Sequence, residues 1–278
     1  MSAPRFPTYF LSHGGGPWPY MKGPMREHYR LLERSLQDLP AQLPERPRAV
    51  LVVTGHWEED AYTVSSSPAP GMVFDYYGFP EYLYHIQYPA PGAPTLAERV
   101  RGLLSAADLP ARADAERGFD HGTFSMMKPI YPDADMPIVQ LSLRHGYDPA
   151  EHWRAGQALA PLRDEGILIV GSGLSYHNLS KFGPAGAEPA MQFDGWLRQT
   201  LAAGPEARRE ALMHWAQAPS AREAHPREDH LIPLMVVLGA AQDDPAVCVY
   251  GERFMGVAAS SFRFGADRTP TAFDELAA

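Results

Sequence analysis

Short apolar runs that each lead through small residues to a histidine constrain this chain more than any other feature. One run, at residues 50–53, continues through Thr54 and Gly55 to His56. A continuous apolar run rich in β-branched residues is typical of a strand buried on both faces, as in a sheet covered by helices. In open α/β sheets, ligands bind outside the carboxyl ends of the strands. His56 therefore stands where a site is expected.

The same pattern occurs elsewhere in the chain. Residues 8–11 lead to His13, and residues 167–170 lead through Gly171 and Ser172 to His177. If these strands are neighbours in one sheet, their histidines converge on one edge. A further predicted strand, at residues 137–143, is followed by His145, which passes the same test as His56.

Helical patterns alternate with these strands. Apolar periodicity predicts helices at residues 25–39, 95–107, 149–165, 191–203 and 205–216, with another that His230 opens and that runs to residue 241. We expect residues 62–65 to form a strand or one arm of a hairpin, and residues 247–250 and 256–264 to form a terminal hairpin. Alternation of this kind predicts an α/β fold with a central, mostly parallel sheet flanked by helices and the site at the carboxyl edge of its strands. No repeat or composition break divides the chain, so we expect one domain over residues 1–278.

Composition narrows the function. The net charge of −9 and the pI of about 5.6 disfavour binding to nucleic acids or anionic membranes, both of which need a basic surface. The single cysteine, Cys248, excludes an intramolecular disulfide and a cysteine-based zinc site, and it fits a reducing compartment. The N-terminus shows no signal peptide and no apolar run is long enough to span a membrane, so we expect a cytoplasmic protein.

Residues 68–94 predict a long loop dense in proline, glycine and aromatic residues. A structureless loop of this length inside a domain is usually functional. We interpret it as an aromatic wall or lid over a site.

Histidine suits zinc, iron, copper and nickel, and three protein ligands with an open position are typical of a catalytic metal site. A single histidine after a strand is more often a hydrogen-bonded loop residue, however, and the chain has no local HxxxH or HExxH pair. Spacing alone leaves several histidines open as ligands, and those on predicted helices are expected to be solvated. The open candidates are His13, His56, His85, His145, His177, His225 and His230, and the helical ones are His28, His152 and His214.

An ordered set of motifs resembles the class III extradiol ring-cleaving dioxygenases, in the branch similar to 4,5-DOPA dioxygenase. The resemblance covers about residues 8–264. Its motifs, in chain order, are SHGGGP (12–17), TGHW (54–57), YPAPG (88–92), GFDHG (118–122), YPDAD (131–135), VQLS (139–142), GSG (171–173) with HNL (177–179), and HLIPL (230–234).

The resemblance implies one Fe(II) or Zn(II) ion per chain. His13, His56 and His230 match the metal ligands. His177 matches the catalytic base, which can also coordinate in this branch, and His121 matches a second histidine at the substrate. His145 and His225 match no histidine of the family.

The matched site departs from the better-studied members of the family. They complete a set of two histidines and one carboxylate, whereas the third matching position here is His230, with Glu228 and Asp229 as neighbours. A site without the anionic ligand carries a higher net charge, which makes a zinc-filled, inactive form plausible. Asp120 and Ser175 are further candidates to fix histidine tautomers.

The resemblance implies that a small catechol, DOPA-like or related, is opened with O2 to a semialdehyde. His177 would accept the proton of a catechol hydroxyl, and His121 would contact a substrate oxygen or return a proton. Two alternatives stay open: a zinc-dependent hydrolase on the same histidines, and a metal-free interaction protein of the same fold. A homo-oligomer is possible.

Overall fold

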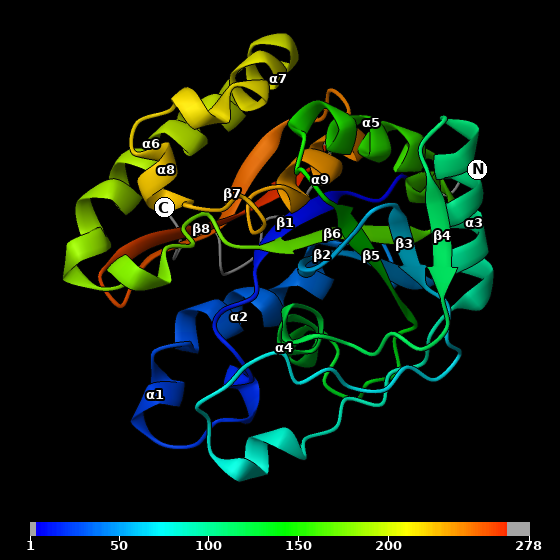
Figure 1. The fold of residues 1–278 in the computed structure, drawn as a ribbon, viewed down its shortest axis with the longest axis horizontal. Coiled ribbons are helices and arrows are strands. Elements are labelled where there is room, and N and C mark those ends of the chain that lie inside the picture. The colour runs from blue at the N-terminus through cyan, green and yellow to red at the C-terminus, as the bar shows by residue number, and fades with distance from the viewer. Residues whose placement is uncertain (1–3, 266–278) are drawn as a thin grey trace.

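The computed structural model describes residues 4–265, in which an eight-stranded sheet forms the central layer (Figure 1). The strand order is β4-β3-β5-β2-β6-β1-β8-β7. Strands β5, β2, β6 and β1 run parallel to one another, while β3 is antiparallel to β5 and β8 to β1. The strands are β1 (Thr8–Ser12), β2 (Ala49–Glu59), β3 (Tyr62–Ser65), β4 (Ala111–Asp114), β5 (Ile138–Arg144), β6 (Ile167–Gly173), β7 (Ala246–Phe254) and β8 (Val257–Phe264). The predicted α/β class is confirmed, and residues 1–3 and 266–278 of the predicted domain lie outside the described residues.

Helices cover both faces of this sheet, with α2 and α4 below it and α5 and α9 above it in Figure 1. The helices are α1 (Pro24–Glu27), α2 (Arg30–Asp38), α3 (Pro94–Ala106), α4 (His121–Ile130), α5 (Pro149–Leu159), α6 (Ala187–Ala202), α7 (Pro205–Met213), α8 (Ala221–Ala224) and α9 (Pro233–Ala241). Short 3-10 helices lie at Trp18–Tyr20, Leu39–Gln42, Glu81–Tyr84, Ala160–Glu165, Leu179–Lys181, Pro184–Gly186 and Trp215–Gln217. No helix of residues 4–265 is long and apolar enough to cross a membrane.

The position of β2 in the centre of the sheet explains why residues 50–53 are all apolar and do not alternate with polar residues. Leu51 and Val53 point into the core beneath α3, α5 and α9, while Val50 and Val52 point into the core shared with α2 and α4. All four side chains are fully buried. Burial on both faces favours a continuous β-branched run over an alternating one.

Strands β1, β2 and β6 are aligned at the residues that precede their histidines. Ser12 of β1 pairs with Gly173 of β6, and Thr54 of β2 pairs with Ser172 of the same strand. Strand β2 continues to Glu59, but its pairing with β5 shifts register between Val53 and Glu58. His56 therefore lies in an irregular stretch inside β2, and not after the end of the strand as the sequence indicated.

Several helix boundaries differ from the prediction, including these three. The helix expected at residues 25–39 is divided into α1 and α2 around His28 and Tyr29. The segment around His121, for which no helix was predicted, begins α4, whose first turn is capped by the Asp120 carboxylate accepting from Thr123 N at 3.0 Å. Helix α4 carries Gly122 and Pro129, both poor helix formers, so its burial outweighs its propensity. The third difference is at α9, which begins at Pro233, three residues after His230.

Candidate metal centre

Three histidines from distant parts of the chain meet at the carboxyl edge of the sheet. His13 follows β1, His56 lies in the irregular stretch of β2, and His230 comes from the turn before α9. The Nε2 atom of His56 lies 3.3 Å from His13 Nε2 and 3.1 Å from His230 Nε2. The structure thus brings together the three predicted ligands.

His230 reaches this edge because its backbone lies directly on β6. Its carbonyl oxygen accepts a hydrogen bond from Leu174 N at 3.1 Å. A Cβ atom on Gly173 would lie 2.1 Å from that oxygen, so only glycine permits the approach. The small residues at the end of β6 therefore have a packing role that positions His230.

Burial keeps these imidazoles neutral. Burial is the main cause that lowers the pKa of His13 and His56 well below the usual value, and the neighbouring histidines lower it further. Burial also lowers the pKa of His230 to about 4, although Asp229 acts in the opposite direction. Neutral imidazole is the form that binds metals.

The spacing of the three Nε2 atoms fits one metal ion better than hydrogen bonding. An imidazole nitrogen carries either one proton or one lone pair, so His56 Nε2 can hydrogen-bond to only one of the two atoms that face it. A cation accepts lone pairs from all three. Metal–nitrogen bonds of about 2.0–2.1 Å at angles between octahedral and tetrahedral place adjacent nitrogens about 2.8–3.4 Å apart. The observed distances of 3.1 and 3.3 Å lie in this range.

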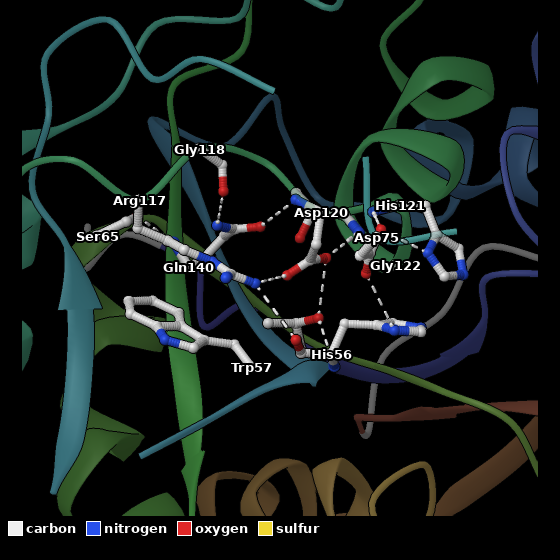
Figure 2. A network of polar contacts seen from close by, with 12 residues as sticks. His56, Trp57, Ser65, Asp75, Arg117, Gly118, Asp120, His121, Gly122 and Gln140 are labelled. Carbon is white, nitrogen blue, oxygen red and sulfur yellow. Dashed lines mark hydrogen bonds and ion pairs between the residues drawn. The ribbon is translucent and has the colours of Figure 1, made fainter. Parts of the chain in front are cut away.

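Asp75, in the loop of residues 68–94, contacts two of the site histidines (Figure 2). Its Oδ1 lies 2.8 Å from Nδ1 of His121, and its Oδ2 lies 3.2 Å from Nδ1 of His56. Burial is the largest single effect on Asp75 and would raise its pKa, but the hydrogen bonds and the electrostatic interaction with His121 together outweigh it, and the pKa is lowered. An ionised carboxylate is therefore present beside both rings.

Asp229 contacts two more of the site histidines. Its Oδ2 lies 3.1 Å from Nδ1 of His230, and its Oδ1 lies 3.7 Å from Nδ1 of His177. The rings of His177 and His230 stack with their centroids 3.4 Å apart. Burial would raise the pKa of Asp229, but His177 and His230 outweigh it and hold the pKa well below the usual value.

Two neighbouring groups of side chains, with no residue in common, could each hold a metal ion. The first comprises His13, His56 and His121, and the second His177, Asp229 and His230, with the candidate ligand atoms of each group within 4.8 Å of one another. The short contact between His56 and His230 joins the two groups. All five predicted site histidines thus lie around one centre.

Asp120 and Ser175 do not have the role that the sequence suggested. The Asp120 carboxylate accepts hydrogen bonds from Thr54 Oγ1 at 3.0 Å and from Arg117 at 3.1 Å (Figure 2). Ser175 Oγ accepts from Ser260 N. Within residues 4–265 neither side chain is hydrogen-bonded to a site imidazole, and Arg117 instead links Asp120 to the backbone oxygen of His56 at 3.3 Å.

The remaining histidines lie apart from this centre. His145 is half exposed, 3.7 Å from Glu58. His225 is fully buried and donates to the carbonyl of Ser175 at 3.0 Å. The solvated position expected for His152 is wrong: it is buried, and its Nε2 accepts from Arg144 N at 3.1 Å. The other histidines, His28, His85 and His214, are exposed.

Aromatic side chains of the loop pack beside the centre. The ring of Tyr76 lies edge-on to His121 with centroids 5.9 Å apart, and it also contacts Phe79 and Tyr84. Tyr77, by contrast, is 92% exposed. The predicted aromatic wall is therefore formed by part of the loop only.

Sequence reasoning missed Asp75 and gave Asp229 no role beyond that of a neighbour. Asp75 lies in an irregular loop, where no periodicity marks a residue as directed at the site. Asp229 was recognisable only as the residue before His230. Carboxylates commonly accept a hydrogen bond from Nδ1 of metal-binding histidines. Both residues could therefore have been proposed as such partners from the sequence.

Comparison with known proteins agrees with this geometry. Residues 7–265 match the family model described as the catalytic LigB subunit of aromatic ring-opening dioxygenase. The chain is 37% identical over 242 residues to the 4,5-DOPA dioxygenase extradiol of Beta vulgaris, covering 85% of this chain and 87% of that protein. It is 38% identical over 245 residues to the protein of the same name from Escherichia coli K12, covering 86% and 87%.

A solved structure shares the fold. The crystal structure of an uncharacterized protein from Escherichia coli K12 matches with a TM-score of 0.77 and 32% sequence identity, covering 94% of this chain and 100% of that one. The family predicted from the ordered motifs is confirmed. The chain belongs to the class III extradiol ring-cleaving dioxygenases, the family of the catalytic LigB subunit of aromatic ring-opening dioxygenases.

Proposed function

We propose that this enzyme opens the ring of a small catechol with O2, next to its two hydroxyl groups, at a metal ion held by His13, His56 and His230. The observation that supports the proposal best is the convergence of the three Nε2 atoms, at 3.1 and 3.3 Å. Relatives named 4,5-DOPA dioxygenase extradiol favour a DOPA-like catechol. Cytoplasmic location and homo-oligomerisation remain predictions.

The donor set suits Fe(II) or Zn(II), because neutral imidazole binds both. Fe(II), when bound, supplies a Lewis acid that lowers the pKa of a catechol hydroxyl and the redox capacity to react with O2. Three neutral imidazoles leave coordination positions open for substrate. Zn(II) in the same site would retain the Lewis acidity without the redox capacity.

His177 is the proposed base that accepts the catechol proton. Its side chain is 19% exposed, and its Nδ1 faces Asp229 at 3.7 Å. The carboxylate favours a proton on Nδ1 and leaves Nε2 free to accept another. Asp229 would then stabilise the imidazolium that forms. Because the His177 ring stacks on that of His230, a shift of the ring would also let it act as a fourth ligand.

His121 is the residue proposed to hydrogen-bond a substrate oxygen or to return a proton to it. Its Nδ1 is engaged by Asp75, so its Nε2 is the atom available to a substrate oxygen. Its side chain is 9% exposed and lies against Tyr76, which limits competition from water.

The test is O2 consumption by protein reconstituted anaerobically with Fe(II). A panel of catechols, including DOPA and a protocatechuate-like acid, should yield O2 uptake and a yellow ring-opened product with at least one member. His230→Ala should lose both metal and activity. His145→Ala, which removes a strand-end histidine remote from the cluster, is the matched control and should retain both.

Each outcome points to a different conclusion. No product from any catechol, in protein shown to retain Fe(II), would refute the proposal. Turnover of an ester or amide with Zn(II) and without O2 would support the hydrolase alternative. Less than about 0.1 metal per chain after gentle purification would favour the metal-free alternative, since built sites bind metal with substantial free energy.

A further inference from the structure

We propose that Asp75 is a positioning residue that orients both the metal ligand His56 and the proton-transfer residue His121 with one carboxylate. The inference rests on the proposed function of these two histidines. Oδ2 of Asp75 lies 3.2 Å from His56 Nδ1, and Oδ1 lies 2.8 Å from His121 Nδ1. Figure 2 shows the carboxylate between the two rings.

The position of Asp75 is fixed by a short pairing between the loop and the segment before α4. Val73 N donates to Phe119 O, and Phe119 N donates to Gly71 O, both at 2.8 Å. Asp75 and His121 each lie two residues after a paired residue, so the pairing sets them side by side. A Cβ on Gly118 would lie 2.7 Å from the Gly71 backbone, so the close approach requires glycine there.

The contact is also sheltered from solvent. The side chains of Asp75, His56 and His121 are 19%, 16% and 9% exposed. Oδ1 of Asp75 accepts a second hydrogen bond, from the backbone N of His121 at 3.1 Å. A carboxylate held from several directions in a low-dielectric site has one orientation, and it imposes that orientation on its partners.

The Asp75 carboxylate determines the tautomer of both imidazole rings. A carboxylate only accepts hydrogen bonds, so it favours a proton on Nδ1 of both histidines. The lone pair of His56 is then on Nε2, which faces His13 and His230. The lone pair of His121 is likewise on Nε2, the atom proposed to face substrate. One residue thus prepares a ligand and an acid–base group together.

Replacing Asp75 with asparagine distinguishes a role in setting the histidine tautomers from a role in packing alone. An asparagine fills the same volume, but its amide presents an oxygen to one ring and an NH2 group to the other. The ring that faces NH2 is driven to the opposite tautomer, with its proton on Nε2. Alanine leaves room for water, which can accept from both Nδ1 atoms. We therefore expect Asp75→Asn to be at least as damaging as Asp75→Ala.

The experiment compares the wild type with Asp75→Asn, Asp75→Ala and Asp194→Asn. Asp194 is a buried carboxylate away from the histidines, bound by Ser260 and by Arg198 at 2.7 Å, and its variant controls for loss of a buried ion pair. Long-range 1H–15N spectra of the metal-free proteins report the tautomer of each histidine. Competition with a chromophoric chelator reports the affinity for Zn2+. Thermal unfolding reports stability.

We expect Nδ1-protonated His56 and His121 in the wild type and a changed tautomer of at least one of them in Asp75→Asn. Zn2+ affinity should fall about 10–100-fold in Asp75→Asn, and change less than about 3-fold in Asp194→Asn. Unchanged tautomers in Asp75→Asn would overturn the proposal, as would a Zn2+ affinity within about 3-fold of wild type. A larger loss in Asp75→Ala than in Asp75→Asn would indicate a packing role instead. None of these readouts involves turnover, so an enzyme that opens no catechol would refute the proposed function alone.

Discussion

Replacing His225 with glutamine should reduce the loss of stability of the metal-free protein between pH 7.5 and 5.5. His225 is fully buried, its Nε2 donates to the Ser175 carbonyl, and its Nδ1 has no partner. Burial lowers its pKa to about 3, whereas an unfolded histidine titrates near 6.5. The unfolded chain therefore binds a proton first. The contribution of His225 to stability is complete above the unfolded pKa and is lost as the pH falls from about 6.5 toward 3.

The size of the effect follows from the two pKa values. While His225 stays neutral in the folded state, protonation stabilises the unfolded state by RT ln(1 + 10^(6.5 − pH)). The free energy of unfolding therefore falls by about 1.4 kcal/mol between pH 7.5 and 5.5. Urea unfolding of the chelated protein at both pH values measures it. Glutamine can keep the hydrogen bond to Ser175 but does not titrate, so the variant should lose about 1.4 kcal/mol less than wild type. An equal loss in the two proteins would show that His225 is not held neutral by the fold.

Three further perturbations test the site's construction. Gly122→Ala lies in a helix, where alanine normally stabilises by about 1 kcal/mol, but its Cβ would be 2.7 Å from His56 Cδ2. We expect urea unfolding to show a loss of about 1–3 kcal/mol and chelator competition to show weaker Zn2+ binding. Gly173→Ala would place Cβ 2.1 Å from the carbonyl oxygen of His230. Because backbone cannot yield as a side chain can, the loss should be about 3 kcal/mol or more, and little folded protein should be recovered. When free metal is present at about 100 times its dissociation constant, removing it with a chelator should lower the free energy of unfolding by about 2.7 kcal/mol. This should appear as a fall in Tm of about 5–10 °C, and an unchanged Tm would argue against a bound metal.

The strands and the histidines at their ends were predictable because local sequence determines them. A run such as residues 50–53 buries both faces of a strand, and only β-branched or other apolar residues satisfy both cores. Parallel neighbours bring their carboxyl ends to one edge, so His13 and His56 were expected to meet there once their strands lie near each other in one sheet. The register shift in β2 was not predictable, because it depends on how β5 pairs with it.

Local sequence patterns could not predict the residues whose positions depend on contacts between distant segments. Asp75 reaches the site through pairing of its loop with Phe119, which no pattern in either segment indicates. His152 lies on a helix that looked solvated, yet the helix packs it against the end of β5, where Arg144 N donates to it. His145 looked equal to His56 from its position after a strand, and only the family motifs and the structure separate the two.

The two carboxylates also bear on the departure of the ligand set from two histidines and one carboxylate. Three neutral imidazoles around a divalent cation leave a charge of about +2 in a buried site, which is costly to maintain. Asp75 and Asp229 are ionised, because the histidine contacts hold the pKa of each below its usual value against the effect of burial. Each lies within about 3.2 Å of a proposed ligand, His56 or His230. Two negative charges would therefore balance a bound cation from the far side of the ligand imidazole rings, and each carboxylate also contacts a histidine proposed to move protons. The charge that the missing carboxylate ligand would supply is thus placed where it also sets the tautomers of the catalytic rings.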